Sequence, residues 1–589
     1  MSTIHRWFRS GAYSLLGHID ALEARQNLGV LIVPPFGWED VCSYRPLRFL
    51  AKTLAANGIP VMRFDLPGTG DSSGNALDSG LFEAWVESID DAAAELRAVA
   101  GVEQVAGFGI RLGALLALTA AARGSSLQDL ILWGATATGR AMLRELRAFG
   151  NLERLEYGNG DSTASAPLPG VEIGGFLISP ETQHALEHLA LSPLPGMPSR
   201  RVLLLSRDDL PADAKLARAL QSAGCGVEDG NGRGYAAVMA LPHEGIPPFA
   251  VARTIVDFLN RRSVPAVRAT NLPKRAVIEG AGSGVNETVY TVDQSSDRLF
   301  GVLTEPAPAV PTAEWCILFL NAGAVRHSGP NRMWVEAARR WASRGVTSLR
   351  LDLTGIGESD GQETLGTEGL YQDHLVEQIQ LAMDSLRSRL GVRRFVAVGL
   401  CSGAFWAFQA AVRSAEIRAA IMLNPRLFFW DPEVDRRRLL RRTVKGLSKW
   451  GDWCRLFRGD VPLESIRQVA RIALERMQEA AGNRPLQIPR ERMAEAWAAI
   501  QRNGTRMTLV FTEGEPLLRE MEDEGQLPPE TCSQVQCLRV PNGGHTFRPL
   551  WAQKLAHELI DRELGAILQK SQTGGSHGDS EPQWATSEA

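Results

Sequence analysis

The chain has 589 residues, of which 44% are apolar and 22% charged, with a formal net charge of -4. A single hydrophobic core rarely grows beyond about 250–300 residues, so this length predicts two well-packed globular domains. The acidic balance and the lack of a basic tail argue against nucleic-acid binding, and no apolar segment approaches the roughly 20 residues that cross a bilayer. We therefore expect a soluble, cytoplasmic protein without a membrane span. Seven scattered cysteines without metal-ligand spacing predict free thiols, and we expect neither a metal site nor a cofactor.

In the first half, short β-rich runs alternate with helical patterns, which is typical of crossover units on a mostly parallel sheet. The predicted strands are residues 30–33, 61–64, 105–107, 130–133 and 202–205. The last strand is followed by a loop that contains His243 and by a predicted closing helix at residues 250–259.

Residues 109–113, Gly-Ile-Arg-Leu-Gly, resemble the tight strand-to-helix turn that presents the nucleophile in α/β hydrolases. Arg111 stands at the nucleophile position, and a guanidinium stays protonated and cannot attack a carbonyl. Prolines at positions 34 and 35 also remove two amide donors from the loop that would bind an oxyanion. Arg111, Asp208 and His243 therefore form a degenerate site, in which Arg111 either pairs with a carboxylate or binds an anionic ligand group.

The second half repeats the first. Residues 350–361 match residues 63–74 at an offset of 287, and the register continues back to the first predicted strand. Between the halves, residues 261–274 are rich in Arg, Pro and Asn with little apolar periodicity, which places the domain boundary between 1–264 and 265–569.

Entry strands within residues 276–303 are expected to open the second half. Its later predicted strands are residues 317–320, 348–351, 395–398, 419–423, 507–511 and 536–540, and residues 550–564 form its closing helix. The order of elements in both halves predicts an α/β fold class with two tandem α/β-hydrolase folds. Each would have a mostly parallel sheet flanked by helices and a helical cap insertion. The polar segment 570–589 is expected to be disordered.

A second tight turn, Gly-Leu-Cys-Ser-Gly, occupies residues 399–403 between an apolar run and an apolar helical pattern. Its two glycines, Gly399 and Gly403, permit the sharp bend, so that the central side chain projects above the sheet. Cys401 is the expected nucleophile because it holds the central position and because a helix N-terminus favours a thiolate. The neighbouring Ser402 remains the alternative.

The partners of the nucleophile are expected on later loops. His545, in a Gly-rich loop after the last strand, is the predicted general base. Glu515 or Glu513, after the preceding strand, would orient it, and we favour Glu515.

The oxyanion hole needs two backbone N–H groups. Ser402 would supply one of them, and Ala322 or Gly323, after the first parallel strand of this half, would supply the other. The side chain of Asn321 is a further candidate donor.

These residues predict an acyl-cysteine intermediate on a small-molecule ester or thioester, released by water as in an esterase or thioesterase, or transferred to an acceptor by an acyltransferase. A basic, aromatic-rich segment at about 424–490 is expected to cap the site and to receive a donor bound to coenzyme A or to a carrier protein; a solvated helix face is its simpler interpretation. The alternative from another class is a non-catalytic binding or scaffold protein with two inactive sites.

The first half resembles the α/β hydrolases called exosortase-A-system-associated hydrolase 2, through residues 34–36, 65–72 and 109–116. The second half is similar to the companion hydrolase 1 type, and its Cys elbow also resembles that of dienelactone hydrolases and polyhydroxyalkanoate synthases. The resemblance covers most of residues 10–565 and implies the fold rather than a substrate.

Overall fold

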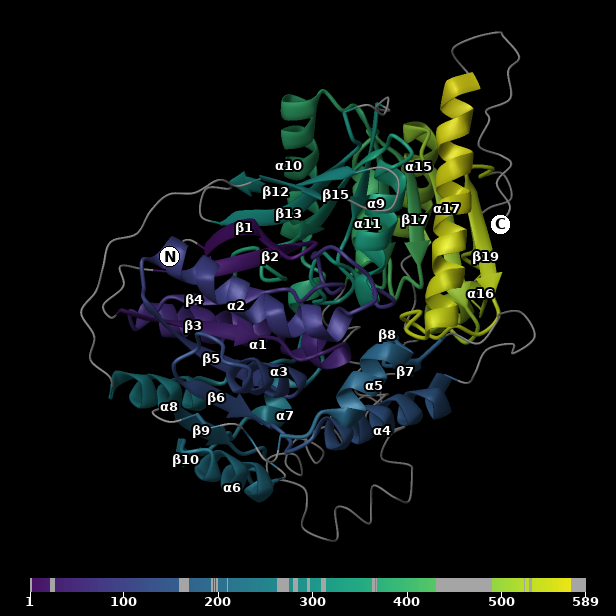
Figure 1. Ribbon diagram of the computed structural model, residues 1–589. Helices are drawn as coiled ribbons and strands as arrows, with labels where there is room; N and C mark the ends of the chain where they lie inside the picture. The colour runs from purple at the N-terminus through teal and green to yellow at the C-terminus, as the bar shows by residue number, and fades with distance from the viewer. Residues whose placement is uncertain are drawn as a thin grey trace, which may run out of the picture.

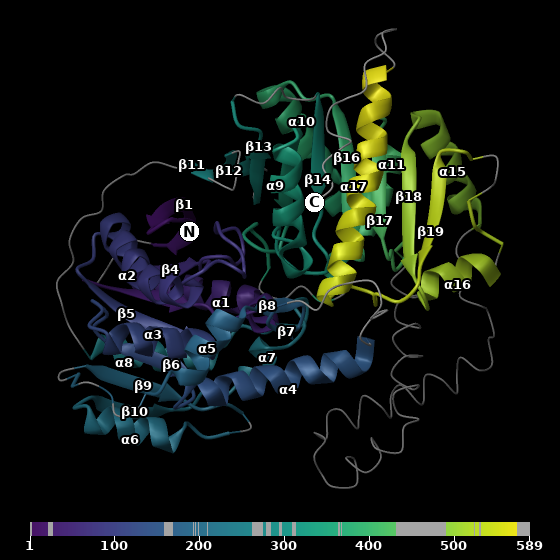
Figure 2. The same ribbon diagram turned by 45° about the vertical axis from the view of Figure 1, so that its right-hand side comes forward.

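The computed structural model describes residues 3–573, except for 22–26, 158–168, 192–193, 195, 198–199, 209, 262–274, 279–283, 294–296, 309–313, 363–365, 367, 431–489, 524 and 529–531. The chain forms two large sheets, each with helices on both faces (Figure 1; Figure 2). Among the described helices, none combines the length and apolarity that a bilayer crossing requires.

The first sheet has eight strands in the order β1-β2-β4-β3-β5-β6-β9-β10. Its strands are β1 (Thr3–Ser10), β2 (Tyr13–Asp20), β3 (Leu28–Val33), β4 (Val61–Phe64), β5 (Gln104–Ile110), β6 (Leu130–Trp133), β9 (Arg201–Leu205) and β10 (Gly226–Gly230). The β1/β2 and β2/β4 pairs are antiparallel, and the later pairs are parallel.

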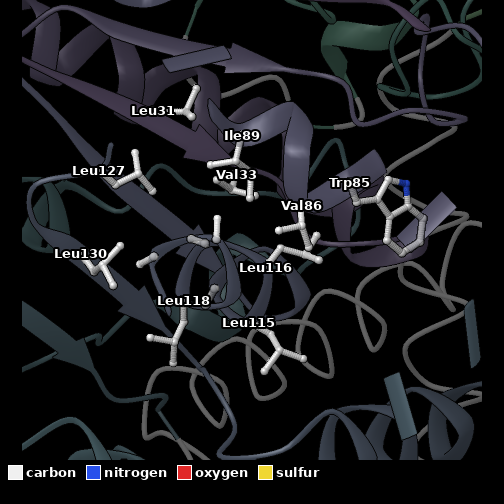
Figure 3. Packing of buried hydrophobic residues seen from close by; sticks show 14 of the residues in the cluster. Leu31, Val33, Trp85, Val86, Ile89, Leu115, Leu116, Leu118, Leu127 and Leu130 are labelled. Atoms are coloured by element: carbon white, nitrogen blue, oxygen red, sulfur yellow. The ribbon is translucent and has the colours of Figure 1, made fainter. Parts of the chain in front are cut away.

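Helices cover both faces of this sheet: α1 (Trp38–Ala56), α2 (Leu81–Ala100), α3 (Leu112–Ala122), α6 (Ala214–Ser222), α7 (Tyr235–Val238) and α8 (Phe249–Asn260). Figure 3 shows how side chains of β3, α2 and α3 meet in one core cluster, with Trp85 at its edge. Helix α3 is buried over almost its whole length, because it lies between the sheet and α2. An insertion after β6 consists of α4 (Gly139–Tyr157), the hairpin β7 (Val171–Ile173) and β8 (Phe176–Ile178), and α5 (Pro180–His188).

The second sheet has nine strands in the order β11-β12-β13-β15-β14-β16-β17-β18-β19. They are β11 (Arg275–Ile278), β12 (Val285–Asp293), β13 (Arg298–Glu305), β14 (Trp315–Phe319), β15 (Thr347–Asp352), β16 (Arg394–Leu400), β17 (Ile417–Leu423), β18 (Arg506–Thr512) and β19 (Val535–Val540). From β13 onward the order repeats that of the first sheet from β2 onward, which is the outcome that the internal repeat predicts.

The second sheet is flanked by α9 (Met333–Ala342), α10 (Asp373–Leu390), α11 (Ser402–Arg413), α15 (Arg490–Asn503), α16 (Pro516–Asp523) and α17 (Leu550–Thr573), with short turns η1 (Pro330–Arg332) and η2 (Glu368–Leu370). Two tandem, mostly parallel sheets flanked by helices confirm the predicted fold class. The predicted domain boundary falls in residues 262–274 and most of the predicted cap falls in 431–489, both outside the described residues. Helix α17 extends to Thr573, past the predicted start of the tail at residue 570; residues 574–589 lie outside the description.

The two domains are joined by a buried, charged interface with approximate twofold symmetry. The guanidinium of Arg63 donates to both carboxylate oxygens of Glu358, at 2.7 and 3.0 Å. In the internal repeat, Arg350 is equivalent to Arg63 and Asp71 is equivalent to Glu358. Arg350 donates to Asp71, so the same pair forms with the domains exchanged. Each domain thus gives an arginine to an acid of the other, the reciprocal pattern of an isologous contact.

His327 lies at the centre of this interface, fully buried between two carboxylates. Its Nδ1 is 2.7 Å from Asp352 of its own domain, and its Nε2 is 2.7 Å from Asp71 of the first domain. Burial of the imidazole opposes its charge, but the two carboxylates outweigh that effect and raise the pKa of His327 to about 10. The ring is therefore an imidazolium that ties the two domains together at neutral pH.

The raised pKa of His327 predicts that the protein loses stability in alkali. Between pH 6.5 and 10 the folded state holds a proton on His327 that the unfolded state has released, so the free energy of unfolding falls as pH rises, by up to about 1.4 kcal/mol per pH unit. We expect His327→Gln to lower the free energy of unfolding by about 3–5 kcal/mol at pH 7, because it leaves Asp352 buried without a cation and leaves Asp71 with Arg350 alone. Urea unfolding across this pH range checks both effects.

The control for this measurement is His374→Gln on the exposed face of α10, which should leave the pH slope unchanged. A wild-type slope that His327→Gln does not reduce would contradict the assignment of the proton to His327.

Candidate active site

Cys401 occupies a strained turn between β16 and α11. Its backbone angles are φ 58° and ψ -114°, in the positive-φ region that non-glycine residues rarely adopt. A Cβ at Gly399 would lie 2.1 Å from the carbonyl oxygen of Gly403, and one at Gly403 would lie 2.4 Å from that of Asn321. Both positions therefore require glycine, and the turn has the geometry of a nucleophile elbow.

His545 and Glu515 are brought together by two loops at the same edge of the sheet. His545 Nδ1 lies 2.9 and 3.1 Å from the two carboxylate oxygens of Glu515, whose side chain is buried. Glu513 is exposed and does not share this contact in the described structure. A carboxylate on Nδ1 fixes the tautomer that leaves Nε2 available for proton transfer.

The thiol of Cys401 and the imidazole of His545 shift each other's pKa. Burial raises the pKa of the thiol. The imidazolium of His545 opposes this effect, with smaller contributions from Arg426 and the Ser402 N–H. Together these groups outweigh burial and lower the pKa of the thiol below its ordinary value. For the imidazole, burial is outweighed by the thiolate and by Glu515, which raise the pKa of His545 to about 10. Both the charge of each group and a side-chain hydrogen bond between the thiol and the imidazole contribute to these shifts.

Ser402 is fully buried at the first position of α11. Its Oγ accepts a hydrogen bond from the backbone N–H of Gly323 at 2.8 Å. This contact holds the loop after β14 against the elbow, so that Ala322 and Gly323 lie beside the start of α11. Because Gly323 N–H is engaged in this way, Ala322 is the remaining oxyanion candidate of this loop, beside the Ser402 N–H that faces the thiol.

The side chain of Asn321 has a structural role rather than the donor role considered for it. Its amide donates to Val325 O at 3.0 Å and to Asp352 at 2.8 Å, and its carbonyl accepts from Leu353 N at 3.1 Å. Asn321 thereby links the loop after β14 to Asp352, the carboxylate that contacts His327.

Asn424 is a positioning residue that sequence reasoning missed, since the sequence presents it only as the first residue of the expected cap. Its amide donates to the carbonyl oxygen of His545 at 2.9 Å and to Thr512 Oγ1 at 3.0 Å, while its own oxygen accepts from Thr512 N at 2.8 Å. It therefore joins the ends of β17 and β18 to the histidine loop. An Asn-Pro pair directly after a buried strand was the available signal.

Arg111 repeats the elbow geometry in the first domain, with φ 56° and ψ -120°. Its guanidinium pairs with Glu39 at 2.9 Å and with Glu145 at 2.7 Å, and it lines a cavity of about 330 Å³. Two roles were predicted for Arg111, and the structure shows the first of them, the pairing of its guanidinium with carboxylates.

The other members of the expected degenerate site are engaged elsewhere. Asp208 accepts backbone N–H bonds from Gly234 and Ala236, both at 2.8 Å. The carbonyl oxygen of His243 accepts from the Gly366 N–H of the second domain at 3.2 Å. The sequence could not show that Glu39 and Glu145, far from Arg111 along the chain, would take the place of Asp208.

Within the described residues, one group has atoms close enough to hold a metal ion: His5, His18 and Glu358. The two Nδ1 atoms lie 2.8 Å apart and share a hydrogen bond, and Glu358 is engaged by Arg63. These contacts make the group a part of the charged domain interface. The basic residues expected in the cap lie almost entirely in 431–489, outside the described structure, apart from Arg426.

Two family models match the chain, one in each half. The model described as the alpha/beta hydrolase family matches residues 317–557, and the model described as serine aminopeptidase, S33, matches residues 42–155. Together with the repeated sheet order, these matches show that the chain is a tandem pair of α/β-hydrolase folds. No curated protein sequence matches the chain.

Several solved structures are similar to part of the chain. A dienelactone hydrolase from Anabaena variabilis is 16% identical, covering 48% of this chain and 99% of its own, with a TM-score of 0.31. Est1E from Butyrivibrio proteoclasticus, bound to ferulic acid, is 16% identical over 43% of this chain and 98% of its own (TM-score 0.31). The thioesterase domain from the curacin biosynthetic pathway is 18% identical over 46% of this chain and 98% of its own (TM-score 0.29). Likenesses this distant say nothing about the substrate.

The lowered pKa of the Cys401 thiol predicts alkylation by iodoacetamide at a pH where ordinary thiols are protonated, because the thiolate is the reactive form. We expect the rate to titrate below the usual thiol pKa, and His545→Gln to move that titration to higher pH. Labelling rates measured by mass spectrometry check this, with Cys401→Ala as the control that subtracts the remaining thiols. A rate that follows an ordinary thiol in both proteins would show that His545 does not act on Cys401.

Proposed function

We propose that the second domain is an acyl hydrolase or acyltransferase that works through an acyl-Cys401 intermediate. The observation that carries this proposal is the presence, in one site, of a thiol at a strained elbow, an imidazole that lowers its pKa and a carboxylate on the far nitrogen of that imidazole. A nucleophile, a base and an orienting carboxylate in this arrangement are a recurring machinery for nucleophilic acyl transfer. The substrate class is a small-molecule ester or thioester.

In the first step the Cys401 thiolate attacks the acyl carbonyl carbon and forms an S–C bond, and the carbonyl electrons move to the oxygen. Backbone N–H groups of Ser402 and Ala322 stabilise that oxyanion. When the C–O or C–S bond to the leaving group breaks, His545 gives it the proton from Nε2. Glu515 accepts the Nδ1–H bond of His545 and keeps the imidazolium oriented throughout.

In the second step water, or an alcohol or amine acceptor, attacks the acyl-Cys401 carbonyl. His545 removes the proton from the attacking group, and the thiolate leaves as the C–S bond breaks. Hydrolysis and transfer use the same residues and differ only in the acceptor. A donor bound to coenzyme A or to a carrier protein suits the basic charge of the segment expected to cap the site.

The first domain, in this proposal, is non-catalytic and supports the histidine loop. The carboxylate of Glu172, in strand β7, accepts the N–H of Leu550 at 2.8 Å, where α17 begins. The carbonyl of Gly175, in the turn of the same hairpin, accepts from the side chain of Gln553 at 2.7 Å. Both views of the molecule show this hairpin beside the start of α17, five residues after His545 (Figure 1; Figure 2).

The acyl-enzyme itself is the first test. After incubation with an activated acyl ester such as p-nitrophenyl acetate, intact-mass measurement should show one added acyl group on the wild type and none on Cys401→Ala. Ser402→Ala should keep the adduct, because its hydroxyl is buried against Gly323 N–H. An adduct that survives Cys401→Ala but not Ser402→Ala would reassign the nucleophile, and no adduct on any variant would contradict the enzyme proposal.

The support of the histidine loop is tested at Glu172. We expect Glu172→Ala to slow acylation of Cys401 by between a few-fold and about 100-fold, since a small displacement of a catalytic group far from the mutation can cost that much. Glu172→Gln keeps a hydrogen-bond acceptor and should recover most of the rate. Burst kinetics measure acylation, and Glu181→Ala is the matched control, because the hydrogen bonds of this carboxylate within the described residues go to Ser79 and Gly80 of the first domain. Equal rates for wild type and Glu172→Ala would contradict this role of the hairpin.

A further inference from the structure

A cavity of about 400 Å³ lies between the two domains, apart from the elbow of either one. On the first-domain side its wall includes four aromatic residues, among them Phe36, whose ring contacts Trp85 and Phe176 at centroid distances of 5.7 and 6.1 Å. The indole N–H of Trp85 is bonded to Pro67 O at 2.8 Å, so its polar atom is satisfied and the ring offers apolar surface. This volume and lining are those of a small-molecule site.

The second-domain side of the cavity includes two arginines, Arg326 and Arg332, and one acid, Glu336. Arg326 pairs with Asp65 at 2.8 Å and with Asp40 at 3.4 Å. Glu336 contacts His557 at 3.3 Å. Of the two arginines, Arg332 is the one that makes no ion pair among the described residues.

The guanidinium of Arg332 is bonded only to neutral groups. Its Nε donates to Gly70 O at 2.8 Å and its Nη2 to Ser72 O at 2.7 Å, and no carboxylate of the described residues lies within 4 Å of it. Burial and the nearby Arg339 lower the pKa of Arg332 to about 10, because they outweigh the opposite effect of Glu336 and two more distant acids. An anion brought into the cavity would compensate that charge.

The backbone that presents Arg332 is strained. Asn331 and Arg332 are consecutive non-glycine residues at φ 49° and 70°, just after Gly329 at 78°. Such conformations persist only where the surrounding structure enforces them, and they are frequent at ligand sites. Here the side chain of Asn331 donates to Gly174 O at 2.8 Å. This bond stabilises the strained turn and thereby keeps Arg332 at the cavity wall.

We propose that this cavity binds a small amphipathic carboxylate, with its carboxylate on Arg332 and its apolar tail against Phe36, Trp85 and Phe176. Arginine suits this contact because its planar fork donates two parallel bonds to a carboxylate. The site borders the proposed catalytic loops, since Val325 follows the loop after β14 and Leu550 follows the histidine loop. It is nevertheless separate from Cys401, and the proposal does not depend on acyl chemistry there.

The internal duplication provides a matched control for Arg332. Its equivalent in the first domain, Arg45, also bonds only to carbonyls of the other domain, Gly355 O at 3.2 Å and Gln362 O at 3.0 Å, but it does not line the cavity. Arg332→Met and Arg45→Met therefore remove similar interface contacts, and only the first removes the charge from the cavity.

The test is calorimetric titration of the full chain with decanoate, and with decanol as the uncharged analogue. We expect saturable binding of decanoate by the wild type, at least tenfold weaker binding by Arg332→Met, and binding within twofold of wild type by Arg45→Met. Decanol should bind the wild type at least tenfold more weakly than decanoate. Leu177→Trp, which fills the cavity without touching the Arg332 contacts, should abolish decanoate binding.

Several results would overturn the proposal. Failure of the wild type to bind decanoate is one, and equal affinity for decanoate and decanol is another. Binding that survives Leu177→Trp would place the ligand elsewhere, including at Cys401, and equal losses in Arg332→Met and Arg45→Met would show that only the interface had been weakened. Loss of acylation at Cys401 with decanoate binding intact would instead count against the proposed function alone.

Discussion

The arrangement of the whole molecule depends on a buried imidazolium held between carboxylates of two domains. His327 contacts Asp352 and Asp71 at 2.7 Å each, and all three side chains are fully shielded from water. Burying such charges costs several kcal/mol per ion unless every group is paired, so this interface is stable only in the register that pairs them all. The reciprocal contacts Arg63 to Glu358 and Arg350 to Asp71 specify the same register. The two folds therefore have one defined relation to each other.

The carboxylate of Asp352 connects this interface to the proposed active site. Asp352 accepts from His327 and from the amide of Asn321, and Asn321 holds the loop that carries Ala322 and Gly323. On the opposite side, the first domain contacts the start of α17 through Glu172, shortly after His545. Both loops that would serve Cys401 are thus anchored at the domain interface. The first domain therefore contributes to the position of both loops.

The sequence allowed prediction of those features that depend on neighbouring residues or on the repeat. Apolar runs located the central strands, and the Gly-x-Cys-x-Gly pattern located the bend at Cys401 because only glycine fits at Gly399 and Gly403. Strands β1, β2 and β10 were missed, since their polar and charged residues hide the alternation of a strand at or near the edge of a sheet. The ion pairs of the interface were beyond sequence reasoning, because their partners lie more than 250 residues apart and charged residues usually indicate exposed surface.

The elbow at Arg111 shows that the backbone geometry of this turn does not depend on the reactivity of its central side chain. Arg111 and Cys401 have nearly the same backbone angles, although a guanidinium cannot be a nucleophile. Selection for catalysis therefore cannot be what maintains the strain at Arg111. The packing maintains it: a Cβ at Gly113 would lie 2.2 Å from Val33 O, so the turn and the loop after β3 fix each other whichever side chain projects from the bend. Reactivity then depends on the side chain at the bend and on its partners. A thiol whose pKa is lowered by His545 is suited to acyl transfer, whereas a guanidinium paired with Glu39 and Glu145 is suited only to packing or binding.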